Sequence, residues 1–144
     1  MPSPTVARYM SPAPVTIAPE RTLLEAHGLM RARRIRHLPV VEGGRLVGVL
    51  SQRDLYLLET LETVDPASET VREAMTADPY AVPPGAPLER VALEMAERRI
   101  GSAVVVDGGA VVGLFTTVDA LRALAVLLHR GPRAPRREER GPRA

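Results

Sequence analysis

The chain has 144 residues, a length that suits one compact domain or two half-size units that share a core. It contains no cysteine and only three histidines, which excludes disulfides and thiolate catalysis and argues against a metal centre. No apolar run reaches the roughly 18 residues of a membrane span, and the first residues lack the pattern of a signal peptide. We therefore expect a soluble, cytoplasmic protein without a membrane-spanning segment.

The 19 basic residues are all arginine, and they are unevenly distributed. Six arginines and two glutamates give residues 129–144 a formal charge of +4, which leaves the rest of the chain at −2. Because this tail is rich in Pro, Gly and Arg, we expect it to be disordered and to attract nucleic acid at most weakly. The absence of lysine and asparagine suits a thermophile, although a GC-rich genome explains the arginine usage more simply.

The most informative feature is an internal repeat. Residues 6–57 reappear at residues 71–122 with one fixed offset and no gap. Gly48 falls on Gly113 and Asp54 falls on Asp119. The period exceeds the roughly 20–50 residues of solenoid units, so it indicates a tandem duplication whose halves pack together, with any site at their shared seam.

The elements of the first copy follow the order β-α-β-β-α. We expect a strand at 15–17, a helix opened by a capping box at Thr22 and Glu25, a hairpin of 38–41 and 46–50, and a helix from 51 to about 61. The second copy repeats this order with a strand at 80–82, a helix from 87, a hairpin turned at 107–110 and a helix over 116–128.

The predicted fold class is therefore α+β, built from two tandem β-α-β-β-α repeats. The domain organisation that follows is a first repeat at 1–62, a linker at 63–70, a second repeat at 71–128 and the tail at 129–144.

Each copy carries a hydroxyl and a carboxylate where its hairpin runs into its last helix: Ser51 and Asp54 in the first copy, and Thr116 and Asp119 in the second. The unsatisfied N–H groups at a helix start suit a phosphate, and a carboxylate is a natural partner for ribose hydroxyls. A nucleotide is thus a fitting ligand. The same spacing also forms an ordinary helix cap, worth about 1 kcal/mol with no ligand at all.

The two copies differ in charge before the hairpin. Arg36 and His37 enter the hairpin of the first copy, and Gly101 and Ser102 stand at their places in the second. An exposed arginine is usually a solvated cation, and a lone histidine is usually structural. If phosphates bind, the two halves should not bind them equally.

Together these residues resemble the CBS domain, named after cystathionine β-synthase, and the chain resembles a CBS-domain pair with little else attached. The resemblance covers roughly residues 6–128 and rests on residues 71–75, residues 35–41 and the two junctions, all in register. It implies a pseudo-two-fold module with two clefts that often bind AMP, ADP, ATP or S-adenosylmethionine, with NAD as a further candidate. It also implies that two pairs associate into a disc-like homodimer.

The resemblance assigns roles to ten residues. Ribose would bind to Asp54 and Asp119, and phosphate would bind to Ser51 and Thr116. The remaining roles are adenine contacts by Val49 and Leu114, contacts across the seam by Ile35 and Ile100, and positive charge from Arg36 with His37 beside it.

The expected function is regulation without catalysis, in which an adenine nucleotide binds and an effector protein of unknown identity responds. No nucleophile, base and orienting group occur together in a pattern that indicates an enzyme. The alternative is a dimeric interaction module with empty clefts, which binds a protein or nucleic acid through its faces or its basic tail.

Overall fold

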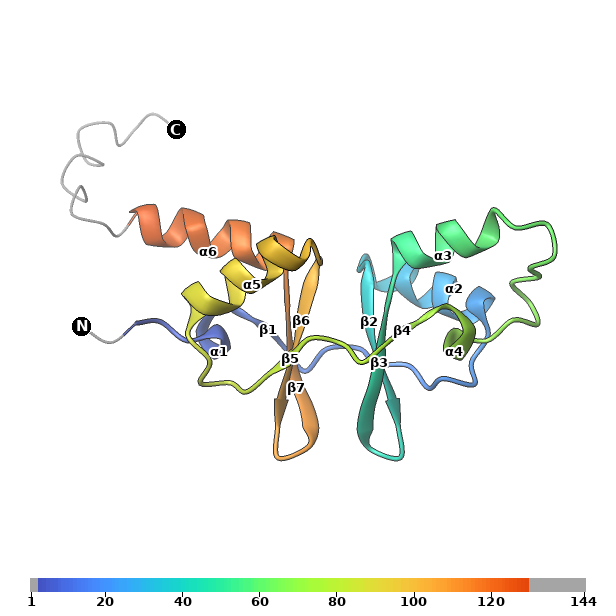
Figure 1. Ribbon diagram of the computed structural model, residues 1–144, viewed down its shortest axis with the longest axis horizontal. Coiled ribbons are helices and arrows are strands. Elements are labelled where there is room, and N and C mark those ends of the chain that lie inside the picture. Colours follow the sequence, from blue (N-terminus) through green and yellow to red (C-terminus); the bar gives the residue numbers. More distant parts are fainter. Residues whose placement is uncertain (1–2, 130–144) are drawn as a thin grey trace.

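A computed structural model describes residues 3–129, which form two halves with mixed helices and strands (Figure 1). The helices are α1 (Val6–Tyr9), α2 (Leu23–Arg33), α3 (Gln52–Glu59), α4 (Val71–Ala74), α5 (Leu88–Arg98) and α6 (Thr117–His129). The strands are β1 (Ser11–Pro12), β2 (His37–Glu42), β3 (Arg45–Ser51), β4 (Thr76–Ala77), β5 (Ala81–Val82), β6 (Ser102–Asp107) and β7 (Ala110–Thr116). The predicted α+β class is confirmed. Of the tail predicted to be disordered, only His129 lies within the described residues, and it ends α6.

Both predicted hairpins form. Strands β2 and β3 pair antiparallel from His37 opposite Ser51 to Glu42 opposite Arg45. Between them Gly43 and Gly44 adopt φ values of +60° and +80°, a left-handed conformation that glycine reaches without a steric penalty. The β6–β7 hairpin repeats this geometry in the second half.

The predicted capping box begins α2. The side chain of Thr22 accepts a hydrogen bond from the Glu25 amide at 3.1 Å, and the Glu25 carboxylate accepts one from the Thr22 amide at 2.9 Å. Two other expectations need correction. Residues 15–17 form no strand, since only Ile17 makes a single bridge to Val40, and the helix expected to reach about Leu61 ends at Glu59.

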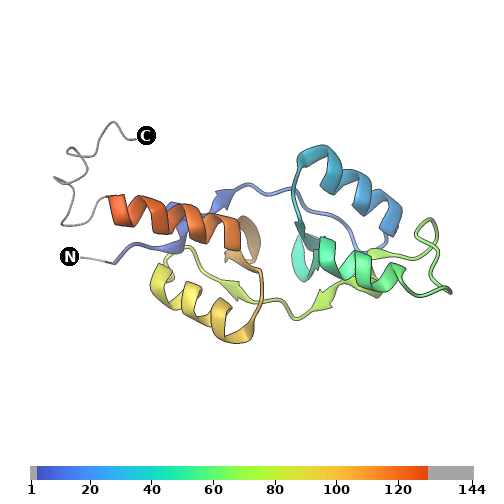
Figure 2. The ribbon, with the colours of Figure 1, turned by 90° about the horizontal axis from the view of Figure 1, so that it is seen from above.

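The sheets do not follow the sequence repeats. Strand β4, at the start of the second repeat, pairs with β3 of the first, and β1, from the first repeat, pairs with β7 of the second. One sheet has the order β2-β3-β4 and the other β1-β7-β6-β5. Viewed from above, the N-terminal segment lies with the half that contains α5 and α6 (Figure 2). Each repeat thus contributes its first short helix and strand to the opposite half.

This exchange also completes the two hydrophobic cores. Val71 on α4 is fully buried among first-repeat residues such as Leu23 and Leu55, and Val6 on α1 is fully buried beside second-repeat residues such as Phe115. Neither repeat closes its core from its own residues alone. This agrees with the marginal stability expected for a unit of about 55 residues.

Replacing Gly48 by alanine tests the close approach of the exchanged segment. A Cβ atom at Gly48 would lie 2.6 Å from Sδ of Met75 and 2.9 Å from the carbonyl oxygen of Thr76, and this backbone oxygen cannot rotate away. We expect Gly48→Ala to lower the free energy of unfolding by about 1–3 kcal/mol in urea denaturation. The control is Gly28→Ala in α2, which meets no atom within 4 Å. It should gain up to about 1 kcal/mol from helix propensity, so equal losses in both variants would contradict this packing.

Candidate functional site

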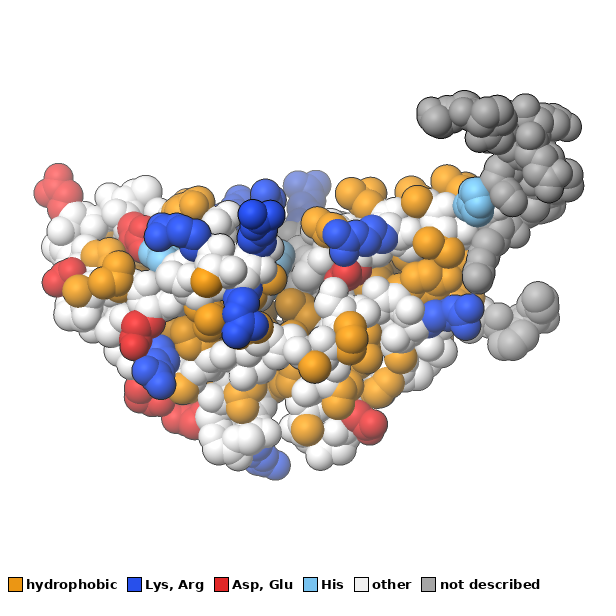
Figure 3. Space-filling model, turned by 180° about the vertical axis from the view of Figure 1, so that it is seen from behind, with side chains coloured by type: hydrophobic (Ala, Val, Ile, Leu, Met, Phe, Trp, Pro, Cys, Tyr) orange, Lys and Arg blue, Asp and Glu red, His pale blue; other side chains and the backbone are white. Residues whose placement is uncertain are grey.

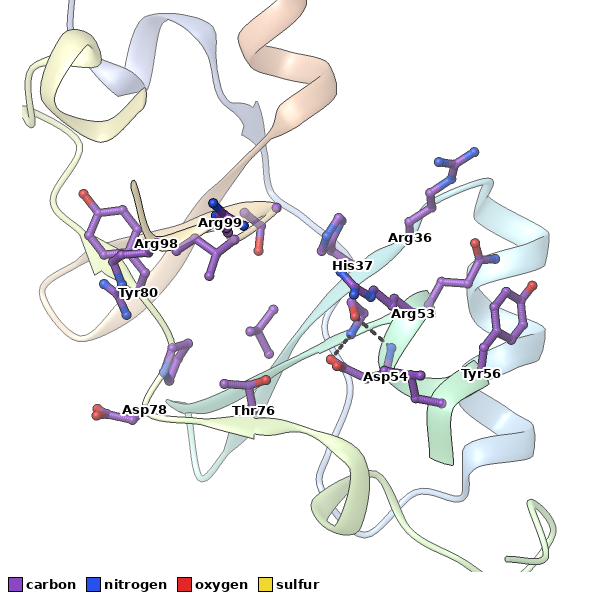
Figure 4. A pocket seen from close by; sticks show the side chains of 18 of the residues that line it. Arg36, His37, Arg53, Asp54, Tyr56, Thr76, Asp78, Tyr80, Arg98 and Arg99 are labelled. Carbon is purple, nitrogen blue, oxygen red and sulfur yellow. Dashed lines mark hydrogen bonds between the residues drawn. The ribbon is translucent and has the colours of Figure 1, made fainter. Parts of the chain in front are cut away.

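A cavity of about 660 Å³ opens between the two halves. It is lined by the β3–α3 junction and the start of β2 from the first repeat, by residues 76–80, and by the turn between α5 and β6. Figure 4 shows these side chains, with His37 and Asp54 on the first half facing Tyr80 and Arg99 on the second. Thr76 on β4 thus brings the segment that the second repeat contributes to the first half into the lining of the site.

At the first junction, Ser51 and Asp54 cap α3 reciprocally. The Ser51 amide donates to Oδ2 of Asp54 at 3.1 Å, and the Asp54 amide donates to Oγ of Ser51 at 3.0 Å (Figure 4). Within residues 3–129, Oδ1 of Asp54 accepts no hydrogen bond. Asp54 is half-buried and lines the cavity, so one carboxylate oxygen stays available to a ligand.

The second junction has the same cap but a different environment. Oδ2 of Asp119 accepts from the amide of Thr116 at 2.9 Å and from its hydroxyl at 3.2 Å. Oδ1 of Asp119 accepts a hydrogen bond from Oγ of Ser11 at 3.0 Å. Asp119 is 5% exposed, and both of its carboxylate oxygens are occupied. The capping interpretation is therefore correct at both junctions, and only the first retains a free acceptor.

Positive charge surrounds the cavity. Its carboxylates are those of Asp54 and Asp78, whereas its guanidinium groups, which come from both halves, are those of Arg36, Arg53, Arg98 and Arg99. Arg98 lies over the ring of Tyr80, 5.0 Å from the centroid, and 3.8 Å from Glu94. The other three make no ion pair among residues 3–129. Such a surface attracts an anion.

His37 lies against the opposite half. A Cβ at Gly101 would come within 3.1 Å of Nε2 of His37, so the glycine makes room for the ring. Burial lowers the pKa of His37 below its ordinary value of 6.5; Asp54 partly offsets this and Arg36 adds to it. At neutral pH the ring is therefore neutral, and positive charge in this part of the cavity comes from Arg36.

The lowered pKa of His37 predicts a pH dependence of stability. Below about 6.5 the unfolded chain binds a proton at His37 that the folded chain does not, so the free energy of unfolding falls as the pH falls. We expect His37→Gln to remove this contribution, giving a smaller loss than in the wild type between pH 7.5 and pH 5.5. Urea denaturation across that range measures it, and parallel curves for the two proteins would contradict it.

Six of the ten residues singled out in the sequence line this cavity: Arg36, His37, Val49, Ser51, Asp54 and Ile100. The other four do not: Leu114, Thr116 and Asp119 lie around the second junction, and Ile35 packs against the first core. Sequence reasoning missed Arg53, Arg99, Thr76 and Tyr80 as lining residues. Arg99 was visible in the sequence as part of a pair that repeats residues 33–34 of the first copy. Thr76 could not be found in this way, because it reaches the cavity only through the pairing of β4 with β3.

The described residues contain neither a candidate membrane span nor a candidate metal-binding cluster. Within residues 3–129, no helix combines the length and apolar character needed to cross a bilayer. The same part of the chain contains no group of three or more His, Asp or Glu side chains placed to hold a metal ion.

Among related sequences, the chain is 32% identical over 115 residues to the CBS domain-containing protein YhcV of Bacillus subtilis (strain 168), covering 80% of this chain and 81% of that one. It is 36% identical over 106 residues to inosine-5′-monophosphate dehydrogenase of Korarchaeum cryptofilum (strain OPF8). That match covers 73% of this chain but 21% of the dehydrogenase, so the chain spans about a fifth of the enzyme's length.

Solved structures share the fold. The CBS domain pair of protein MJ0100, in complex with 5′-methylthioadenosine and S-adenosyl-L-methionine, superposes with a TM-score of 0.78 at 28% identity, over 86% of this chain and 98% of that one. CBSX2 in complex with AMP gives a TM-score of 0.72 at 27% identity, over 84% and 96%. The family model of the CBS domain matches residues 6–58 and again residues 71–126. The chain therefore belongs to the CBS domain family and contains two tandem copies of that domain.

Proposed function

We propose that the chain binds an adenine nucleotide in the cavity between its two halves and regulates a partner protein without catalysing a reaction. The observation that carries this proposal is Asp54, a half-buried carboxylate with one free oxygen in a cavity where arginines outnumber acids. The adenosine compounds bound by two structural neighbours support it. The volume of about 660 Å³ is within the usual range for a small-molecule site.

The cavity offers a place for each part of a nucleotide. Val49 and Ile100 supply apolar surface from opposite halves for the base. The free oxygen of Asp54 can accept hydrogen bonds from the ribose hydroxyls, which are donors. The phosphates then extend toward Arg36 and Ser51, and a ligand bound in this way contacts both halves. Ligand binding therefore favours one arrangement of the two halves over others. A partner protein can recognise that arrangement.

The arginines favour a phosphate-bearing ligand. Arg36, Arg53 and Arg99 are free of acidic partners within residues 3–129, and guanidinium groups bind phosphate through paired hydrogen bonds. S-Adenosylmethionine has no phosphate and carries a sulfonium cation, which these groups would repel. We therefore propose ADP or ATP as the preferred ligand, then AMP, with S-adenosylmethionine weaker.

Thermal unfolding of nucleotide-stripped protein tests the proposal. A ligand at about 100 times its dissociation constant adds roughly 2.7 kcal/mol to the stability of the folded state. We expect ADP and ATP to raise the Tm by several degrees, AMP by less, and S-adenosylmethionine least. If millimolar concentrations of all these compounds left the Tm unchanged, the nucleotide proposal would fail. The alternative of a ligand-free interaction module would then be favoured.

We also propose that two copies associate through their helical faces. Helices α2, α3, α5 and α6 all lie on the side of the sheets opposite the hairpin turns (Figure 1). Leu121, Leu124 and Leu128 on α6 are 64%, 52% and 69% exposed, and Tyr56 and Leu57 on α3 are 55% and 59% exposed. Hydrophobic side chains gather over the α6 end of the molecule (Figure 3). Exposed apolar surface of this kind marks an interface.

Charge substitution on α6 tests this association. We expect the double variant Leu121→Glu and Leu124→Glu to convert a dimer into a monomer in light scattering, because a dimer would bury both charges. The control is Arg45→Glu at a hairpin turn, on the opposite side, which should leave the mass unchanged. A wild-type chain that is already monomeric at all concentrations tested would contradict the proposal.

A further inference from the structure

We infer that Ser11 closes the second junction to nucleotide, so that each chain binds a single nucleotide, at Asp54. The inference rests on the proposed function, since it concerns which of two similar junctions the same ligand occupies. The duplicated sequence motif is equally complete at both places. The distinction comes from the segment that each repeat contributes to the opposite half.

Ser11 reaches the second junction because β1 pairs with β7. The register places Ser11 opposite Leu114, the residue predicted to line an adenine pocket. From there its hydroxyl donates to Oδ1 of Asp119 at 3.0 Å. Leu114 and Asp119 are 7% and 5% exposed, so the apolar and the acidic positions of this junction are both covered.

Each carboxylate oxygen of Asp119 already accepts a hydrogen bond, whereas Oδ1 of Asp54 accepts none within residues 3–129. Thr116 occupies Oδ2 with its amide and its hydroxyl, and Ser11 occupies Oδ1. Arg122 also lies 4.0 Å from Oδ1. Because ribose hydroxyls need an acceptor and Asp119 is buried, a nucleoside that binds there in the manner proposed for Asp54 has to displace Ser11 from Oδ1 to reach it.

The first junction provides the internal comparison. Thr76 on β4 occupies the position of Ser11 in the duplicated sequence and pairs with Val49, the equivalent of Leu114. Both Thr76 and Asp54 line the cavity, yet no hydrogen bond joins their side chains within residues 3–129 (Figure 4). The same structural position therefore leaves one carboxylate available and closes the other.

Two differences between the repeats also disfavour phosphate binding at the second junction. Arg36 and Arg53 of the first repeat correspond to Gly101 and Val118 of the second. The second junction thus lacks the cations that its own repeat would supply to a phosphate. A hydrogen bond to a charged group contributes enough that breaking the Ser11 contact should weaken binding about 10- to 150-fold relative to the first junction.

Equilibrium dialysis with ADP measures the number of sites. We expect the wild-type chain to saturate at one nucleotide per chain up to about ten times the dissociation constant. Ser11→Ala should raise this number toward two, because it frees Oδ1 of Asp119 and removes only an exposed hydroxyl. The control Ser68→Ala, which removes an exposed hydroxyl outside the cavity and both junctions, should stay at one. Thermal unfolding verifies that both variants fold.

The outcomes separate this inference from the proposed function. Absence of ADP binding in the wild type would overturn both. Two equal sites per chain in the wild type, or a single site lost in Asp119→Ala and kept in Asp54→Ala, would overturn the inference and leave the nucleotide function standing. A Ser11→Ala variant that folds and still binds one nucleotide would show that Ser11 does not close the junction.

Discussion

Replacing Asp54 by alanine is expected to abolish nucleotide binding at physiological concentrations. The variant removes the acceptor proposed for the ribose hydroxyls, and hydrogen bonds to a charged group contribute about 1.5–3 kcal/mol each. Two such bonds correspond to a loss of roughly 100-fold or more in affinity. Calorimetric titration with ADP gives the affinity. Loss of the cap should also lower the free energy of unfolding of the ligand-free chain by about 1 kcal/mol.

The equivalent substitution Asp119→Ala is the matched control, and the opposite pattern is expected for it. Asp119 is 5% exposed and accepts hydrogen bonds from Thr116 and Ser11, so its removal leaves both donors without this acceptor and takes away the cap of α6. Stability should fall by about 1–3 kcal/mol, whereas ADP affinity should change by less than about threefold. If Asp119→Ala abolished binding and Asp54→Ala did not, the assignment of the site to the first junction would be wrong.

Replacing Val71 by aspartate is expected to cause the largest loss of stability. Val71 belongs to the second repeat by sequence but is 0% exposed in the core of the first half. A carboxylate there has no partner, and a change of this kind costs more than about 4 kcal/mol. Hydrogen exchange should show that protection is lost first across residues 23–55. Val118→Asp is the control, since Val118 is 50% exposed and lies in the first turn of α6.

The part of the chain that first loses hydrogen-exchange protection in Val71→Asp tests the exchange of segments. If Val71→Asp opened residues 88–123 first and left the first half protected, the exchange of segments between the repeats would be contradicted. Uniform loss in both halves would contradict it too, because the two cores are separate clusters of buried residues.

The hairpin turns and helix caps could be predicted from the sequence because residues close together in the chain form them. A glycine pair turns each hairpin, and a hydroxyl followed three residues later by an acid caps α2, α3 and α6. These features depend on neighbouring residues and were confirmed where the structure describes them. The short helices α1 and α4 were missed because four residues carry too little periodicity.

The exchange of segments could not be read from the repeat. In two similar repeats, β4 can pair either with the sheet of its own repeat or with the sheet of the other repeat. The alignment of the two copies is the same in both cases. The asymmetry of the site has the same origin. Ser11 and Thr76 are equivalent in sequence, and only three-dimensional contacts distinguish the hydroxyl that binds Asp119 from the one beside Asp54.

A crystal structure of the chain grown with ADP tests the central claim most directly. We predict one nucleotide per chain in the cavity between the halves, with its ribose on Asp54 and its phosphates beside Arg36. The hydrogen bond between Ser11 and Asp119 should persist in the complex. A nucleotide bound at Asp119 instead, or one that leaves Asp54 without a contact, would contradict the account.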